Sequence, residues 1–203
     1  MKKVGKNILL TLCLMFFGIS WAEEIVPVDS QTILLRGSAE IKNGMRLVTG
    51  DKNSKDKIHG PMTYYTVPYT DGTFSLSWKV EEKQKIMFVF DEKGRKKLAH
   101  CLKVVVNGSI GKKSGENDLT FITYDGSTIE KKKAKIVKHE YHAAEGQWHT
   151  FSITFEGNKA TVTINDKIFI ISSEKFRKQI VKSGIGHYVG TLQTKDVKVN
   201  IIK

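Results

Sequence analysis

The sequence predicts an all-β domain made of two packed antiparallel sheets, with one short helix. Three observations predict it: almost every segment after Asp29 alternates polar and apolar residues, turn residues separate these segments, and the chain has only three prolines. About ten to thirteen short strands of this kind are typical of a β-sandwich. No internal repeat or Pro/Ser-rich linker divides the chain, so we expect a single domain.

The first half of the chain contains four well-marked strands. Residues 73–80 (TFSLSWKV) alternate, which predicts a strand with one buried and one wet face. Residues 86–90 (IMFVF) are apolar on both faces and predict a central strand that is covered on each side. Residues 98–106 (LAHCLKVVV) and 119–124 (LTFITY) predict two more, and the alternation places His100 on the face of Leu102 and Val104.

Residues 147–170 (QWHTFSITFEGNKATVTINDKIFI) predict a three-strand antiparallel meander. Gly157-Asn158 and Asn165-Asp166 supply its two turns. His149 has the parity of the apolar residues Phe151, Ile153 and Phe155, so we expect it to face the core. Trp148 has the opposite parity and should face outward.

The end of the chain predicts a helix followed by a closing strand. The helix should run from Glu174 to Lys182, with Ser172 or Ser173 as its cap and Gly184 as its end. The strand covers 196–202 (DVKVNII). Two polar, glycine-containing segments, 50–60 and 107–118, are expected to be loops, where binding residues often lie.

The N-terminus predicts an export signal. Three lysines precede an apolar stretch from Ile8 to Ile19, and Ser20 and Ala22 are small residues at the −3 and −1 positions of a cleavage site. We expect residues 1–22 to be a signal peptide, 23–31 a lead-in and 32–203 the folded domain, with a periplasmic or secreted location. An uncleaved anchor is the alternative. Cleavage would leave 203 − 22 = 181 residues, and we expect no membrane insertion after it.

Charge and cysteine content narrow the possible partners. The formal charge of +12 falls to 12 − 3 = +9 without Lys2, Lys3 and Lys6. This charge suits acidic or sulfated polysaccharides, whereas export makes nucleic acid an unexpected partner. After cleavage Cys101 is the single cysteine, which excludes an internal disulfide, and its apolar surroundings predict a buried side chain.

Three stretches resemble one superfamily. GQWHTFSITFEGNKATVTINDKIF is similar to the late meander of concanavalin A-like lectin/glucanase domains, and SGIGHYVGTLQTKDVKV is similar to their closing strand pair. GRKKLAHCLKVVVNG resembles a strand of exported bacterial members that are assigned to the 3-keto-disaccharide hydrolase domain family, which is loosely called family-16-like. The resemblance implies a jelly-roll sandwich that handles sugar on its concave sheet.

The chain departs from the catalytic patterns of these relatives. It has no Glu-x-Asp-x-x-Glu strand, which would aim alternate carboxylates at a sugar, and KQKIMFVFDEKGR stands where relatives carry Asn-Ser-Gly followed by Arg. We therefore expect non-covalent carbohydrate binding. A glycoside hydrolase acting on 3-keto-disaccharides or related sugars is the first alternative, and a laminin-G-like protein-interaction module is the second.

Candidate residues follow from these hypotheses. Aromatic rings stack on sugars, while histidines and short polar groups bind hydroxyls. The candidate carbohydrate-binding residues are therefore Tyr64, Tyr65, Tyr69, His187 and Tyr188. One member of the adjacent pair Tyr64-Tyr65 should point outward. If the chain is an enzyme, the acid and base groups would come from Asp91, Glu92, His100, Asp125 and His187.

No cofactor or metal site is predicted. The chain has no glycine-rich phosphate loop, serine nucleophile elbow or zinc-type cysteine spacing. His139 and His142 are three residues apart and would face opposite sides of an extended chain. Asp51, Asn53 and Asp56 could hold a structural calcium ion, but their loop is rich in lysine.

Overall fold

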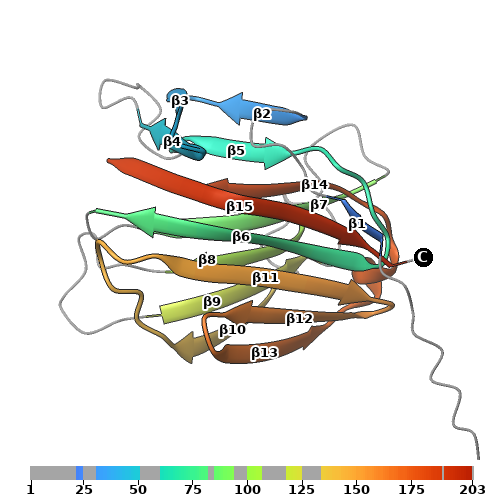
Figure 1. The fold of residues 1–203 in the computed structure, drawn as a ribbon. Helices are drawn as coiled ribbons and strands as arrows, with labels where there is room; N and C mark the ends of the chain where they lie inside the picture. The colour runs from blue at the N-terminus through green and yellow to red at the C-terminus, as the bar shows by residue number, and fades with distance from the viewer. Residues whose placement is uncertain are drawn as a thin grey trace, which may run out of the picture.

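Alternating side chains along the strands create two antiparallel sheets whose apolar faces meet (Figure 1). The computed structural model describes residues 22–24, 31–50, 60–81, 85–93, 100–106, 118–124, 134–188 and 190–202. The all-β prediction is confirmed.

We call the two sheets sheet A and sheet B. Sheet A has the order β13-β12-β11-β6-β15-β4-β3, and β1 also pairs with β15. Its strands are β1 (Ala22–Glu24), β3 (Ser38–Lys42), β4 (Met45–Thr49), β6 (Gly72–Val80), β11 (His149–Glu156), β12 (Lys159–Ile164), β13 (Lys167–Ser172) and β15 (Thr191–Ile201).

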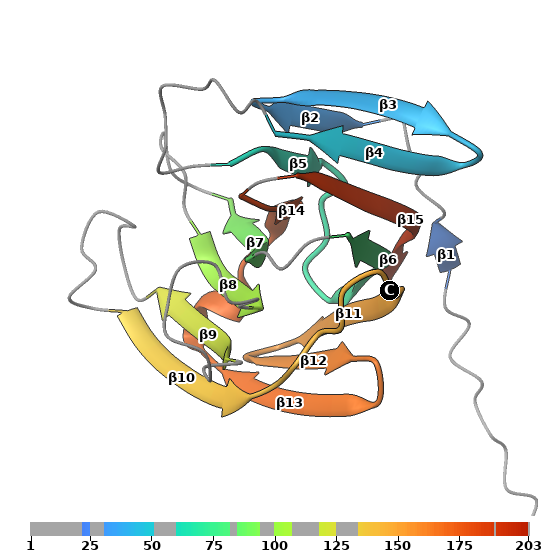
Figure 2. The same cartoon turned by 90° about the vertical axis from the view of Figure 1, so that its left-hand side faces the viewer.

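Sheet B has the order β10-β9-β8-β7-β14-β5-β2. Its strands are β2 (Thr32–Leu35), β5 (Met62–Tyr65), β7 (Ile86–Glu92), β8 (His100–Val106), β9 (Asp118–Tyr124), β10 (Ala134–Glu140) and β14 (Ile180–Gly186). Figure 2 looks along the sandwich and shows the strands of sheet B following a curve whose hollow side faces away from sheet A.

The core lies between the sheets and consists mainly of aromatic and β-branched side chains. β6 shows strict alternation, because every second residue from Gly72 to Val80 is buried. Phe88 of sheet B stacks on Phe151 of sheet A with ring centroids 3.7 Å apart, and Trp78 packs against Phe88 at 6.3 Å. This inter-sheet aromatic packing holds the two layers together.

β7 is the covered central strand that the sequence predicts. Phe88 and Phe90 face the core. Val89 lies on the outer face of sheet B and is nevertheless buried, because it packs with Met62 and Tyr64 in a second apolar cluster. The apolar residues on both faces of β7 are therefore both used in packing.

The predicted meander is present as β11, β12 and β13, with the expected faces. His149 is buried and Trp148 is exposed. His149 donates from Nε2 to the carbonyl of Ala144 at 2.8 Å, and its Nδ1 accepts from the Asn165 side chain at 3.1 Å. The structure thus gives His149 a packing and bonding role inside the sandwich.

The predicted helix is shorter than expected. Only a single 3-10 turn forms, η2 (Glu174–Arg177), with Ser173 as its cap. Ile180 instead starts β14, where its backbone exchanges hydrogen bonds with Tyr69 and pairs with Glu92. Sheet pairing therefore overrides helix propensity from residue 180 onward.

The long closing strand β15 joins both ends of the described chain. It pairs with β6 along one side, and with β4 and then β1 along the other. Ala22, after which cleavage is predicted, begins β1, while residues 1–21 lie outside the described part. No helix in the described ranges has the length and apolarity needed to cross a membrane.

Candidate functional site

A shift in strand register places a carboxylate and an imidazole together on the hollow face of sheet B. β7 and β8 pair Phe90 with Leu102, but the next pair is Asp91 with His100, so Cys101 is an extra residue in β8. Such a bulge reverses the facing of the residues beyond it. His100 therefore points outward with Asp91, and the expectation that it shares the inner face of Leu102 and Val104 is wrong.

Asp91 and His100 form a direct contact. The Nδ1 atom of His100 lies 2.5 Å from Oδ1 of Asp91, and the two side chains are 10% and 4% exposed. A carboxylate accepts, so Nδ1 is the donor and the neutral ring leaves Nε2 as its unprotonated nitrogen. The second carboxylate oxygen, Oδ2, is buried and has no hydrogen-bond partner within the described part of the chain.

Two tyrosines flank this pair on the same face. The Tyr64 ring packs against Gly184, where an added Cβ would come within 2.8 Å of the ring, and the Lys182 ammonium lies 5.7 Å from the ring centroid. The Tyr124 ring lies 6.0 Å from His100 and 5.6 Å from the Lys103 ammonium. We call Asp91, His100, Tyr64, Tyr124, Lys103 and Lys182 the Asp91–His100 cluster.

The electrostatics of the cluster act on Tyr64. Burial raises the pKa of its hydroxyl strongly, the nearby Asp91 carboxylate raises the pKa further, and Arg36 opposes both effects. Tyr64 therefore stays a neutral phenol that can donate or accept a hydrogen bond. Burial also raises the pKa of Tyr124.

Two other predicted catalytic residues, Glu92 and His187, lie elsewhere. Glu92 points to the opposite face from Asp91, where its Oε1 accepts from Lys178 at 3.3 Å. His187 is fully buried and donates from Nε2 to the carbonyl of Gly190. Asp125 lies outside the described residues. Among the four candidates in the described ranges, only Asp91 and His100 lie together.

Most of the predicted sugar-stacking residues are not accessible. Tyr65 and Tyr69 face the core, where the Tyr69 hydroxyl bonds the Ser183 side chain at 3.0 Å. Tyr64 is the outward member of its pair, but it is only 3% exposed. Tyr188 is half-buried with the Lys85 ammonium 5.5 Å from its ring. Neither Tyr65 nor Tyr69 offers a ring face to a ligand.

The described ranges contain no group of three or more His, Cys, Asp or Glu residues that could hold a metal ion. His139 packs its ring on Phe169 and Phe121, and the 51–59 loop lies outside the described residues. Cys101 is buried, and burial raises the pKa of its thiol, so it is not a reactive thiolate.

Sequence reasoning missed Tyr124, Lys103 and Lys182 as neighbours of the site. Tyr124 has the outward parity of its strand and could have been found by alternation alone. The contact between Lys103 and Tyr124 depends on the pairing of β8 with β9. The contact between Lys182 and Tyr64 depends on the pairing of β14 with β5. Neither pairing can be predicted from a local sequence pattern.

Solved structures with the same architecture include carbohydrate-binding modules and a lectin. Module CBM66 from Bacillus subtilis matches with a TM-score of 0.58 at 10% identity, covering 82% of this chain and 93% of that one. The CBM2 module of the evolved Dit protein of Lactobacillus casei BL23 phage J-1 gives 0.59 at 14%, covering 85% and 90%. Lectin II from Ulex europaeus gives 0.56 at 12%, covering 87% and 94%. At these identities the likeness establishes the jelly-roll fold.

The sequence comparisons identify the family. No curated protein matches the chain significantly. The family model for the 3-keto-alpha-glucoside-1,2-lyase-like domain matches residues 21–183, which is most of the chain. The chain therefore belongs to the family of 3-keto-alpha-glucoside-1,2-lyase-like domains.

Proposed function

We propose that this chain binds carbohydrate non-covalently at the Asp91–His100 cluster on the hollow face of sheet B. The observation that carries the proposal is the buried Oδ2 atom of Asp91, which has no partner in the described part of the chain. A buried carboxylate oxygen without a donor is costly, and a sugar hydroxyl is a suitable donor for it. Lys182 and the Tyr64 hydroxyl lie on the same face as further polar groups.

The relatives support a carbohydrate ligand. The family description names a 3-keto-glucoside, and two structural neighbours are named as carbohydrate-binding or CBM modules. Neutral and anionic sugars both remain candidates, because the formal charge of +12 would favour an acidic polysaccharide without requiring one.

A glycan array followed by calorimetry tests the proposal. Wild-type protein should bind at least one glycan, and Asp91→Asn should weaken that binding about tenfold or more, because a charged acceptor is lost. Glu156→Gln, an exposed carboxylate on β11 of sheet A, is the matched control and should bind as wild type. Absence of binding to every glycan, or equal affinity of a folded Asp91→Asn variant, would contradict the proposal.

A second candidate function is cleavage of 3-keto-glucosides, and the His100–Asp91 contact favours it. Asp91 orients the ring so that Nε2 could act as a general base, as in other carboxylate–imidazole pairs. The neighbouring carboxylate Glu92 contacts Lys178 on the opposite face, so Asp91 and Glu92 do not form the carboxylate pair of a glycoside hydrolase. The geometry therefore suits elimination better than hydrolysis.

The elimination balances without a further reagent. His100 Nε2 takes the C2 proton, which the neighbouring C3 ketone acidifies. The C2–H electron pair then forms the C1–C2 double bond and the C1–O bond breaks. The leaving oxygen takes up the proton that His100 Nε2 now carries, which regenerates the base. A chromogenic aryl 3-keto-α-glucoside measures this release directly. His100→Gln should abolish release while Glu156→Gln retains it, and release that survives His100→Gln would contradict the base assignment.

The protein-interaction alternative would be favoured by a face of sheet B without aromatic side chains, whereas Tyr64 and Tyr124 both lie on that face.

We also propose export. The N-terminal lysines, apolar stretch and Ser20-Trp21-Ala22 site support it. Mass spectrometry of the protein from a fractionated host should find a mature chain that starts at Glu23 outside the cytoplasm. A full-length cytoplasmic chain would contradict export.

A further inference from the structure

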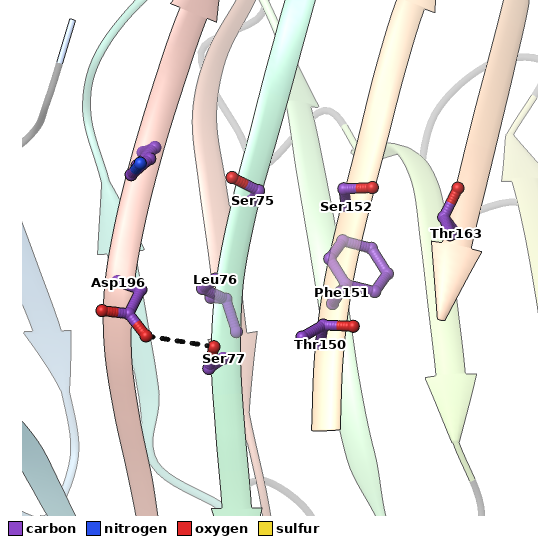
Figure 3. Close-up of a pocket in the computed structure, with 9 residues that line it drawn as sticks. Ser75, Leu76, Ser77, Thr150, Phe151, Ser152, Thr163 and Asp196 are labelled. Atoms are coloured by element: carbon purple, nitrogen blue, oxygen red, sulfur yellow. Dashed lines mark hydrogen bonds between the residues drawn. The ribbon is translucent and has the colours of Figure 1, made fainter. Parts of the chain in front are cut away.

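A second surface, on the outer face of sheet A, has the construction of a binding trough. Its floor is a hollow of about 260 Å³ lined by short hydroxyl side chains from three neighbouring strands, β6, β11 and β12, and bordered by Asp196 and Lys198 of β15 (Figure 3). We call these residues the hydroxyl trough: Ser75, Ser77, Thr150, Ser152 and Thr163.

A bulge in β15 builds one wall of the trough. β15 pairs Lys195 with Ser77 and Lys198 with Ser75, so Asp196 and Val197 together oppose the single residue Leu76, and β15 has one extra residue here. Asp196 adopts a φ of 55°, an uncommon conformation for a residue other than glycine. The Ser77 hydroxyl donates to its Oδ2 at 3.3 Å, as Figure 3 shows, and its side chain is 63% exposed. The bulge thus aims a carboxylate at the hydroxyl floor.

The opposite wall is apolar. Ile168 and Ile170 of β13 pair with Thr163 and Thr161 and therefore lie on the same face as the trough. Their side chains are 65% and 70% exposed. Exposed isoleucines beside a hydroxyl floor give an amphipathic surface. Such a surface suits a sugar chain, because the isoleucines can contact its C–H groups while the hydroxyl side chains bond its hydroxyls.

Trp148 stands at the end of the trough. It is 36% exposed and precedes Thr150 by two residues, so both lie on the outer face. The Lys195 and Lys79 ammonium groups lie 4.5 and 5.9 Å from its ring centroid and hold the ring over the sheet. A positioned, partly exposed indole is a suitable stacking surface for a sugar ring.

The charges around the trough nearly cancel: the three lysines Lys79, Lys195 and Lys198 lie beside the two carboxylates Glu81 and Asp196, so the formal sum is 3 − 2 = +1. Lys79 contacts Glu81 at 2.7 Å, and the Lys195 ammonium lies 3.9 Å from Asp196. The trough together with its two walls spans five strands, from β15 to β13, or about 19 Å at the usual strand spacing. That width exceeds a monosaccharide and suits an extended, uncharged chain.

We propose that the outer face of sheet A binds a neutral polysaccharide chain, with Trp148 stacking on one sugar ring and the hydroxyl trough and Asp196 bonding its hydroxyls. This surface lies on the opposite side of the sandwich from the Asp91–His100 cluster and does not depend on it. The chain would then hold a polymer on one face while the other face contacts its own ligand.

Affinity electrophoresis tests the proposal with soluble polysaccharides cast in the gel: hydroxyethylcellulose, xylan and levan as neutral probes and alginate as the anionic one. Wild-type protein should be retarded by at least one neutral probe. Ser152→Arg, which fills the floor, and Trp148→Ala should each weaken this retardation about tenfold, and Trp148→Phe should retain part of it. Thr70→Arg adds the same charge at an exposed position in the segment before β6, outside the trough and its walls, and should have no effect.

Circular dichroism confirms that each variant is folded, and the set is repeated with Asp91→Asn. Retardation that is lost with Asp91→Asn but not with Ser152→Arg would move binding to sheet B and overturn the inference. The inference is equally overturned if no neutral probe retards the wild type, or if only alginate does so and salt removes the effect.

Discussion

His100 of β8 faces Asp91 of β7 because Cys101 is bulged between two otherwise regular strands, and the two side chains meet at 2.5 Å. The bulge buries Cys101 in the core, where its thiol donates to the carbonyl of Phe90 at 3.4 Å. One inserted residue therefore provides both a core contact and the polar pair of the candidate site.

This contact predicts the tautomer of His100. The neutral ring should carry its proton on Nδ1, because the partner of Nδ1 is a carboxylate. Long-range ¹H–¹⁵N spectra of the ring distinguish the two tautomers, and Asp91→Ala should remove the preference for Nδ1. His149 serves as the internal control with the opposite tautomer, since its Nε2 donates to Ala144. A wild-type His100 protonated on Nε2 would refute the pairing.

Buried His187 predicts acid sensitivity. Burial lowers its pKa from 6.5 to about 4, opposed by the hydrogen bond to Gly190. Between these values the unfolded chain binds a proton that the folded chain does not, so stability falls as the pH drops from about 6.5 to about 4. The contribution amounts to about 3 kcal/mol.

Urea unfolding between pH 7 and pH 4 measures this effect. The stability of His187→Gln should depend less steeply on pH than that of wild type over this window, whereas that of the exposed His142→Gln should follow wild type. Equal slopes for all three proteins would show that His187 is protonated in the folded chain at the same pH as in the unfolded one.

The substitution Gly184→Ala tests whether the Tyr64 ring packs against residue 184. A Cβ at residue 184 would lie 2.8 and 2.9 Å from two atoms of the Tyr64 ring, so Gly184→Ala must displace the ring. We expect a loss of about 1–3 kcal/mol in the free energy of unfolding. Gly50→Ala is the control, because its Cβ would find ordinary contacts at 3.5 Å or more. Equal stabilities of the two variants would be inconsistent with the packing of Tyr64 on Gly184.

We expect Asn165→Gly to destabilise the folded protein, although glycine suits the backbone conformation at this position. Asn165 has a φ of 54°, which glycine adopts more easily, but its side chain accepts from the Thr150 amide at 3.0 Å and donates to the Tyr141 hydroxyl and His149 Nδ1, both at 3.1 Å. Asn165→Gly should therefore cost about 1–3 kcal/mol in chemical denaturation.

The matched substitution is Asn43→Gly, at a φ of 52° in the turn between β3 and β4. It should change stability by only a few tenths of a kcal/mol. If Asn165→Gly were equally neutral, the side-chain bonds of Asn165 would contribute nothing measurable.

Regular alternation made much of this fold predictable. The parity of residues 147–170 placed His149 inside and Trp148 outside, and both are found there. The same rule identified the buried face of β6, and the apolar residues on both faces of 86–90 identified the central position of β7. Period-two patterns are reliable where a strand is regular, since each side chain then has only two faces to choose from.

The tertiary structure decided where the candidate site lies. Alternation placed His100 inside, and only the pairing of β8 with β7 reveals the bulge that turns it toward Asp91. The helix prediction failed for the same reason, because the backbone of Ile180 finds partners in Tyr69 and β7 that a sequence window cannot contain. The local sequence therefore determined which residues form strands and which faces are apolar. The tertiary structure determined which polar groups meet, because it inserts single residues into the strand pairing at Cys101 and at Asp196. Those insertions depend on the register between strands, and that register is set by packing across the whole sandwich.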